Sequence, residues 1–248
     1  MIFTVNLGES MLAPESDMQS LSAMQTSHPF LADDYHIRWS TLTPDKVEAD
    51  IDQGLKLAEA NLEKIRNLED SEVSYENTFG ALEVASEGLD RAWGRLNHLD
   101  SVCNNDDQRV VLNAALPKVT AFYSAIALDD AIWAKLKAFS ESAAAKALDA
   151  IHTRYIEETC AEFIQSGADL PADKKSRVAE VQARLSEITQ KFSENVLDST
   201  NAWELIVDDE SRLTGLPESA KAGAAADAAA KGHEGKWRFT LQYPSMGP

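Results

Sequence analysis

The chain has 248 residues, of which 44% are apolar and 26% are charged, which is ordinary for a soluble globular protein with a sizeable core. Its 41 acidic side chains leave a formal net charge of −18, which argues against nucleic acid and anionic membranes as partners. Glycine and proline are sparse, at 11 and 8 residues, which favours helices over turn-rich β structure. The composition therefore predicts a mainly α protein, and no apolar run approaches the length of a membrane span.

Residues 1–27 differ from the rest of the chain. They begin with a short apolar stretch that no basic residue precedes, and they continue as an acidic segment rich in serine and methionine. This pattern is a poor match to a signal or transit peptide, so we expect a poorly ordered leader and a cytoplasmic protein. Cys103 and Cys160 are far apart and form no Cys-x-x-Cys pair, which leaves no visible redox or metal motif.

Apolar side chains at helical spacing predict the first two helices. Thr43 at the N-cap and Pro44 at the first helical position start one helix. Its apolar stripe consists of Val47, Ile51, Leu55, Ala58, Leu62 and Ile65. A turn at 74–77 precedes a second helix, which the Asn-Asn-Asp run at 104–106 ends. The apolar positions of this second helix are Phe79, Leu82, Leu89, Trp93 and Leu96.

Four further helices are predicted before residue 202. The first contains Pro117, which should kink it or split it in two. A short helix follows over 132–139, and a longer one from about 142 to 166 ends at Gly167. The longest helix starts after Leu170–Pro171. Its apolar stripe consists of Val178, Val181, Leu185, Ile188 and Phe192.

After Trp203 the apolar spacing changes from helical to alternating. Residues 203–207 and 236–241 read as two short strands, and the alanine-rich stretch 220–231 between them reads as a short surface helix. We therefore expect a poorly ordered leader over 1–27, a helical domain over 28–201 and a strand–helix–strand element over 202–248.

The sequence offers no constellation that carries hydrolytic or metal chemistry. Its five histidines are His28, His36, His98, His152 and His233. The nearest approach to a zinc-binding His-Glu-x-x-His helix is the run from His233 to Trp237, where tryptophan stands in place of the second histidine. Four pairs of adjacent aspartates lie at expected helix ends and turns, where aspartate caps and bends the chain: 33–34, 106–107, 129–130 and 208–209. We therefore assign no catalytic, cofactor-binding or metal residue to this chain.

Several segments, in this order, resemble the N-terminal region of the oligopeptidase A / thimet oligopeptidase family of zinc metallopeptidases. They are His28-Pro29-Phe30-Leu31, Tyr75-Glu76-Asn77-Thr78, Ser166 to Pro171, Phe192 to Thr200, Gly215 to Ser219, and Phe239-Thr240-Leu241. His28 departs from the asparagine that opens the corresponding family segment. Each motif alone is weak, and the resemblance depends on their shared order and spacing.

The resemblance implies a multi-helix N-terminal half that walls a channel and admits short peptides. It also implies that zinc, held by a His-Glu-x-x-His helix and a downstream glutamate, lies in a C-terminal half that this chain does not contain. On this reading the chain is the N-terminal part of a zinc metalloendopeptidase, inactive alone and binding no zinc, with short peptides and the catalytic half as partners. The alternative is a stand-alone, non-catalytic helical binding or scaffold module derived from that fold.

Overall fold

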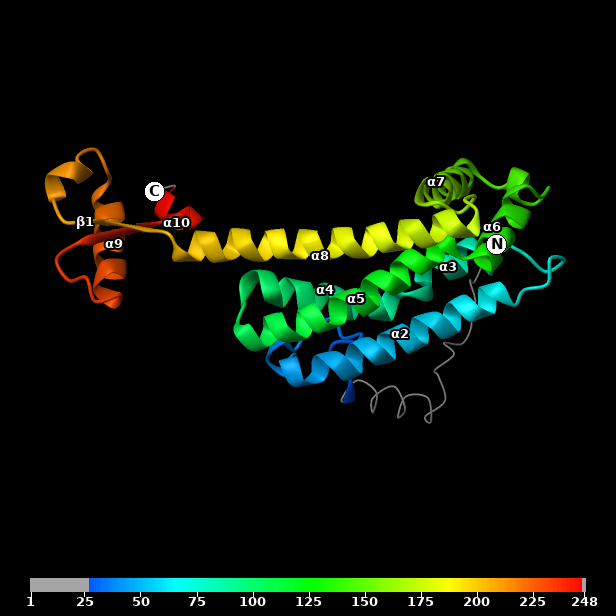
Figure 1. Cartoon of the computed structure of the whole chain (residues 1–248), viewed down its shortest axis with the longest axis horizontal. Helices are drawn as coiled ribbons and strands as arrows, with labels where there is room; N and C mark the ends of the chain where they lie inside the picture. The colour runs from blue at the N-terminus through cyan, green and yellow to red at the C-terminus, as the bar shows by residue number, and fades with distance from the viewer. Residues whose placement is uncertain (1–26, 247–248) are drawn as a thin grey trace, which may run out of the picture. The chain divides into compact units, whose positions relative to one another are not determined.

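In the computed structural model, which describes residues 27–246, the regular elements of the described part are helices apart from one pair of short strands (Figure 1). The predicted mainly α fold with a two-stranded element near the C-terminus is confirmed. The chain divides into two compact units, Met1–Arg184 and Leu185–Pro248, and one long helix contributes to both. The leader predicted over 1–27 lies, but for Ser27, outside the described residues, and the domain boundary near residue 201 stays a prediction.

The elements follow one another with short connections. In chain order they are η1 (Trp39–Thr41), α2 (Pro44–Arg66), α3 (Phe79–Ala85), α4 (Glu87–Val102), α5 (Asp106–Leu128), α6 (Asp130–Ser140), η2 (Ala145–Ala147), α7 (Ala150–Ser166), α8 (Ala172–Ala202), β1 (Glu204–Val207), η3 (Glu210–Leu213), α9 (Glu218–Ala230), β2 (Trp237–Thr240) and α10 (Tyr243–Met246). Each η element is a single 3-10 turn.

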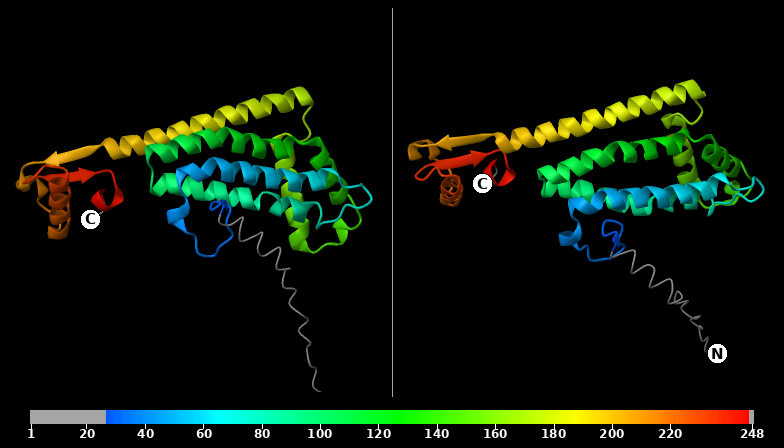
Figure 2. Two further views of the ribbon diagram at one scale, coloured as in Figure 1. Left: turned by 90° about the horizontal axis from the view of Figure 1, so that it is seen from below. Right: turned by 60° about the horizontal axis from the view of Figure 1, so that its bottom comes forward.

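Helix α2 is the centre of the first unit and lies side by side with α4 and α5 (Figure 2). It begins where the sequence predicts, with Thr43 extended before Pro44. Its predicted stripe is buried except for Leu55, which is partly buried. The stripe joins two apolar clusters. One contains Phe30, Val47, Ile51, Leu89, Leu96 and Leu112, and the other contains Leu62, Ile65, Phe79, Ile132, Leu136 and Phe139.

The second predicted helix is in fact two helices, α3 and α4, which meet at Ser86. The prediction of one continuous helix was wrong because a tertiary contact interrupts it. The Asn61 side chain of α2 donates a hydrogen bond of 3.1 Å to the carbonyl of Ala85. The Ser86 hydroxyl in turn donates to the Asp90 carboxylate at 2.9 Å, so polar groups at the break are satisfied.

The helix expected from about residue 142 starts later, as α7 at Ala150. Asp149 decides this start, because its carboxylate accepts hydrogen bonds from the backbone N–H groups of Ile151 and His152, each at 3.0 Å. The residues before it form the 3-10 turn η2 instead. The predicted end is confirmed, since Gly167 follows the helix with a φ of +110°, a conformation that side chains disfavour.

Helix α5 continues through Pro117, so the predicted split into two helices does not occur. It is also long and apolar enough, by length and composition alone, to cross a membrane. The expectation that no apolar run approaches a membrane span is therefore wrong for this helix. Core helices of soluble proteins meet the same criterion, and Leu112, Ala115 and Val119 of α5 are buried in the first unit.

The second unit contains the strand pair and α9. Strands β1 and β2 are antiparallel, and Leu205 faces Phe239 while Val207 faces Trp237. Both strands and the helix between them lie where the sequence predicts them. Helix α9 packs against β2 and buries Ala224 and Ala228, so the alanine-rich stretch is a helix with one packed face.

Candidate functional site

A cavity with a volume of about 810 Å3 lies within the second unit. The end of α8, both strands, η3, α9 and α10 contribute to its walls. Its apolar lining includes Leu205, Val207, Leu213, Leu216, Ala224 and Phe239. Its charged lining consists of Arg212, Asp227, Lys231 and Arg238. An apolar hollow with a few charged groups is the general form of a ligand site.

Arg238 forms two short ion pairs at this cavity. Its Nε donates to Glu204 at 2.7 Å across the strand pair, and its Nη1 donates to Asp227 of α9 at 2.6 Å. These two carboxylates raise the pKa of Arg238, and the same contact lowers the pKa of Glu204. Because its guanidinium is paired with both Glu204 and Asp227, Arg238 fixes α9 against the strand pair and is not placed for proton transfer.

Two further hydrogen bonds connect the end of β2 with neighbouring elements. The Gln242 side chain donates to Asn201 of α8 at 3.0 Å, and the backbone N–H of Thr240 donates to the Ser245 hydroxyl at 2.9 Å. Amide and hydroxyl groups are of the kind that orients polar ligands, but these residues supply neither a nucleophile with an adjacent base nor a metal site. The cavity is therefore equipped for binding.

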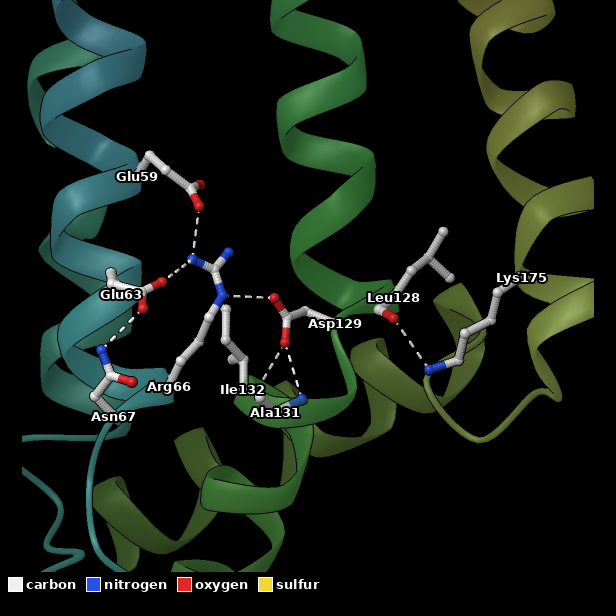
Figure 3. A network of polar contacts seen from close by, with 9 residues as sticks. All are labelled: Glu59, Glu63, Arg66, Asn67, Leu128, Asp129, Ala131, Ile132 and Lys175. Atoms are coloured by element: carbon white, nitrogen blue, oxygen red, sulfur yellow. Dashed lines mark hydrogen bonds and ion pairs between the residues drawn. The ribbon is translucent and has the colours of Figure 1, made fainter.

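A second polar centre lies in the first unit, around Arg66 at the end of α2 (Figure 3). Its Nε donates to Asp129 at 2.7 Å, and its Nη1 donates to Glu59 at 2.6 Å and to Glu63 at 3.0 Å. Burial opposes the charge on Arg66, but the three carboxylates outweigh it and raise the pKa above its ordinary value. Glu63 also accepts from Asn67 at 2.8 Å, and both bonds lower its pKa.

Asp129 and Asp130 show how one predicted aspartate pair is used. Asp129 caps α6 by accepting from the N–H groups of Ala131 and Ile132, at 2.9 and 3.0 Å (Figure 3). Asp130 accepts from the buried ammonium of Lys175 at 2.6 Å. This pair therefore joins α2, α6 and the start of α8, as a structural reading of the sequence predicts.

The other aspartate pairs lie before or at helix starts or in irregular segments. Asp33 pairs with Arg91, and Asp34 pairs with Arg38. Residues 106 and 107 open α5, and Asp209 caps η3. The interpretation as helix-start residues is confirmed for Asp106, Asp107 and Asp209, whereas Asp33 and Asp34 form ion pairs in an irregular segment.

The structure does not bring the five histidines together. His98 lies on α4 beside Trp39, and His152 lies on α7, where its Nδ1 is 2.8 Å from Asp149. The run from His233 to Trp237 occupies the turn between α9 and β2, so its side chains do not share a helix face. Across residues 27–246, no three His, Cys, Asp or Glu side chains are grouped as metal ligands, so these residues do not fit a zinc site.

Two buried charged residues, Asp50 and Arg95, were not identified from the sequence. Asp50 of α2 is fully buried and accepts from His28 Nδ1 at 2.8 Å and from the Phe30 N–H at 2.7 Å. Arg95 of α4 is 7% exposed and donates to the carbonyls of Pro29 and Phe30. Both hold the segment before α2 in place. A charged residue among apolar helix positions is the only signal the sequence carries for them.

Helix α8 presents an apolar stripe to solvent. Leu185, Ile188 and Phe192 are 61%, 50% and 67% exposed, and Val181 and Val196 are similarly open. The predicted apolar residues therefore lie along one helix, but their side chains are exposed and are not part of a core. A row of exposed apolar side chains at helical spacing is typical of a surface that another protein segment covers.

Comparison with known proteins agrees with the resemblance. Residues 51–175, about half of the chain, match the family model described as Neurolysin/Thimet oligopeptidase, N-terminal domain. Oligopeptidase A of Haemophilus influenzae is 31% identical over 225 residues, covering 91% of this chain and 33% of that protein. Oligopeptidase A of Escherichia coli is 29% identical, and the match covers 85% of this chain and 31% of that protein. A probable cytosolic oligopeptidase A of Arabidopsis thaliana is 32% identical, and the match covers 78% of this chain and 28% of that protein.

The chain thus spans about a third of the length of these relatives. The matched region includes the helices from α2 to the start of α8, which carry the core of the first unit. The chain belongs to the neurolysin/thimet oligopeptidase family of peptidases and corresponds to its N-terminal region.

Proposed function

We propose that this chain is the N-terminal, channel-walling part of a zinc-dependent peptidase that hydrolyses short peptides. The observation that carries the proposal is the position of the match. Relatives named as oligopeptidases align with most of this chain, yet the chain spans about a third of their length and matches a model of the N-terminal domain. The chemistry of peptide hydrolysis is accordingly assigned to a catalytic half outside these 248 residues.

The geometry supports a non-catalytic role for residues 27–246. Their best-formed polar centres, around Arg66 and Arg238, are closed networks in which charged groups already have partners. The α8 stripe supports the presence of a covering partner, which in this proposal is the catalytic half. Zinc belongs to that half, and a cytoplasmic location agrees with the printed name of the Arabidopsis relative.

Complementation tests this function. The chain would be produced alone and mixed with the C-terminal two thirds of the Haemophilus influenzae relative, and hydrolysis of fluorogenic short peptides would be measured with and without a chelator. We expect no hydrolysis and no tightly held zinc from the chain alone, and chelator-sensitive hydrolysis from the mixture. Chelator-sensitive turnover by the chain alone would contradict the proposal.

The reading frame provides an independent test that does not depend on reassembly. The proposal requires a His-Glu-x-x-His helix in the same gene product, downstream of residue 248, or in a separately encoded partner. A genome in which neither exists would favour the alternative function.

That alternative is a stand-alone binding module, and the cavity of about 810 Å3 is the observation that favours it. A binding module would retain short peptides without cleaving them. Equilibrium dialysis of labelled short peptides against the chain alone separates the two functions. Saturable binding that Phe239→Ala weakens, without hydrolysis, would support the module.

A further inference from the structure

The cavity of the second unit has an apolar wall that continues from the core to the surface. Leu205 faces Phe239 across the strand pair, and Val207, two residues further along β1, lies on the same face. All three side chains line the cavity. Val207 is buried, whereas Leu205 is 42% exposed. An apolar ligand that enters the cavity can therefore contact this wall without displacing a core side chain.

Two cations at the cavity have no partner in the described part of the chain. Arg212, in η3, and Lys231, directly after α9, line the cavity and are exposed. Neither side chain forms a hydrogen bond or an ion pair with another of residues 27–246. Every other arginine in that range has such a contact. Both charges are therefore available to a ligand at this cavity.

Three carboxylates of this unit that could neutralise these cations already have other partners. Asp227, the acidic residue in the lining, accepts from Arg238 Nη1 at 2.6 Å. Glu204 accepts from the Nε of the same guanidinium at 2.7 Å. Asp209 caps η3 by accepting from the Ser211 N–H at 2.9 Å. In a chain of net charge −18, unpaired cations beside an apolar wall therefore indicate a ligand that brings its own negative charge.

The size and the chemistry of the cavity favour an organic carboxylate over an inorganic anion. A volume of about 810 Å3 lies within the range of small-molecule sites, whereas one water occupies only about 30 Å3. A guanidinium and an ammonium group both donate charge-assisted hydrogen bonds to carboxylate oxygens. A ligand that joins a carboxylate to an apolar group would satisfy the cations and the wall together.

We propose that the cavity of the second unit binds an organic acid, with its carboxylate at Arg212 and Lys231 and its apolar group against Leu205 and Phe239. This chemistry has two sources, the C-terminal end of a peptide that finishes in an apolar residue and a free aliphatic carboxylic acid. For the binding-module alternative the proposal specifies the group that is recognised. It involves no hydrolysis, so failure of the complementation assay would leave it standing.

NMR titration of the full chain tests the site with two pairs of probes. Acetyl-Ala-Ala-Leu is compared as the free acid and as the C-terminal amide, and hexanoate is compared with hexanamide, at constant ionic strength. We expect the backbone N–H signals of Leu205 and Phe239 to shift saturably with an acid, with a Kd on the order of 0.1–1 mM. The matching amide should bind at least about 10-fold more weakly, because it lacks the charge. The acid with the lower Kd identifies the source.

Variants that remove a single charge identify the cations. Arg212→Gln and Lys231→Gln should each weaken binding of the acid about 10-fold and leave binding of the amide unchanged. Lys236→Gln is the matched control, because Lys236 is an exposed lysine of the same unit that does not line the cavity. Its Kd should stay within about two-fold of the parent.

Three results would overturn the proposal. Neither acid could bind saturably, which would leave the cavity without a carboxylate ligand. Acid and amide could bind equally, which would remove the role of the cations but leave peptide binding by a stand-alone module intact. Lys236→Gln could weaken binding as much as Lys231→Gln, which would show a general effect of charge.

Discussion

Individual aspartates in this chain have similar sequence contexts but different structural consequences. Asp129 is one fifth exposed and caps α6 while pairing with Arg66, whereas the side chain of Asp130 is 88% exposed and pairs with Lys175. The two residues are adjacent, carry the same charge and open the same helix. They therefore form a matched pair for measuring what the Arg66 network contributes.

We expect Asp129→Ala to lower the free energy of unfolding by about 2–4 kcal/mol, because it removes an N-cap and a charge-assisted hydrogen bond together. Asp130→Ala should cost less, about 1 kcal/mol, since Asp130 is exposed and the buried Lys175 ammonium keeps its hydrogen bond to the Leu128 carbonyl. Urea denaturation of both variants measures the difference. Equal losses would show that the network in Figure 3 adds nothing beyond surface charge.

Asp50 should make stability depend on pH in an unusual direction. Burial raises its pKa above the ordinary 3.8, although the Phe30 N–H, His28 and Lys46 act in the opposite direction. The folded chain therefore holds this proton more tightly than the unfolded chain. The resulting stabilisation is complete below pH 3.8 and is lost as pH rises through the folded pKa.

Asp50→Asn removes this titration, so the stability of the parent minus that of the variant should fall as pH rises above 3.8. The variant itself should lose about 1–3 kcal/mol, because its amide cannot satisfy both the Phe30 N–H and His28. Denaturation on both sides of pH 3.8 measures the profile. Asp52→Asn, on the exposed side of α2, controls for the lost charge, and parallel profiles for parent and Asp50→Asn would contradict the assignment.

At the scale of elements, the packing of α2 against α4 depends on a glycine. A Cβ at Gly54 would lie 3.3 Å from the Leu89 Cα and from the Leu31 side chain, whereas a Cβ at Gly94 of α4 would meet nothing within 4 Å. Both glycines lie inside helices, where alanine has the higher propensity. The same substitution therefore has opposite expected outcomes.

Gly94→Ala should raise the free energy of unfolding by about 0.5–1 kcal/mol, which is the gain in helix propensity. Gly54→Ala should lower it by about 1 kcal/mol or more, because the Leu89 backbone cannot move aside without shifting α4. Thermal and urea denaturation of the two variants test this. A gain at both positions would mean that the two helices adjust freely.

At the scale of the whole molecule, the α8 stripe is the exposed apolar surface that the proposed catalytic half would cover. Covering several hundred Å2 of apolar area contributes on the order of 10 kcal/mol at about 25 cal/mol per Å2, which is an upper estimate. We expect the isolated chain to bind dyes that report exposed apolar surface and to self-associate, both less so once a catalytic half is added.

Phe192→Glu should reduce dye binding and self-association while changing stability by less than about 0.5 kcal/mol, since Phe192 is 67% exposed. Ser193→Glu introduces the same charge at a neighbouring exposed polar position and should leave dye binding unchanged. A dye-silent monomeric parent would instead favour the stand-alone binding module, because such a protein would have no uncovered apolar stripe.

Local signals in the sequence determined most of the helix and strand positions. Pro44, Gly167 and Pro171 act through backbone conformation, which depends on a few neighbouring residues. The change from helical to alternating spacing after Trp203 likewise located β1 and β2. The order of weak motifs determined the family, because a series of matches is specific even where each match is not.

Contacts between distant residues decided the rest. Asn61 hydrogen-bonds to the Ala85 carbonyl where α3 ends. Asp149 accepts from the first N–H groups of α7 and so sets where that helix begins. Gly54 has no side chain and therefore lets α4 approach α2 closely. The sequence predicted the apolar stripe of α8 but not its exposure, since periodicity identifies an apolar face and not what covers that face. The cavity of about 810 Å3 could not be predicted from the sequence either, because it brings together side chains from separate helices and strands whose proximity only the tertiary fold creates.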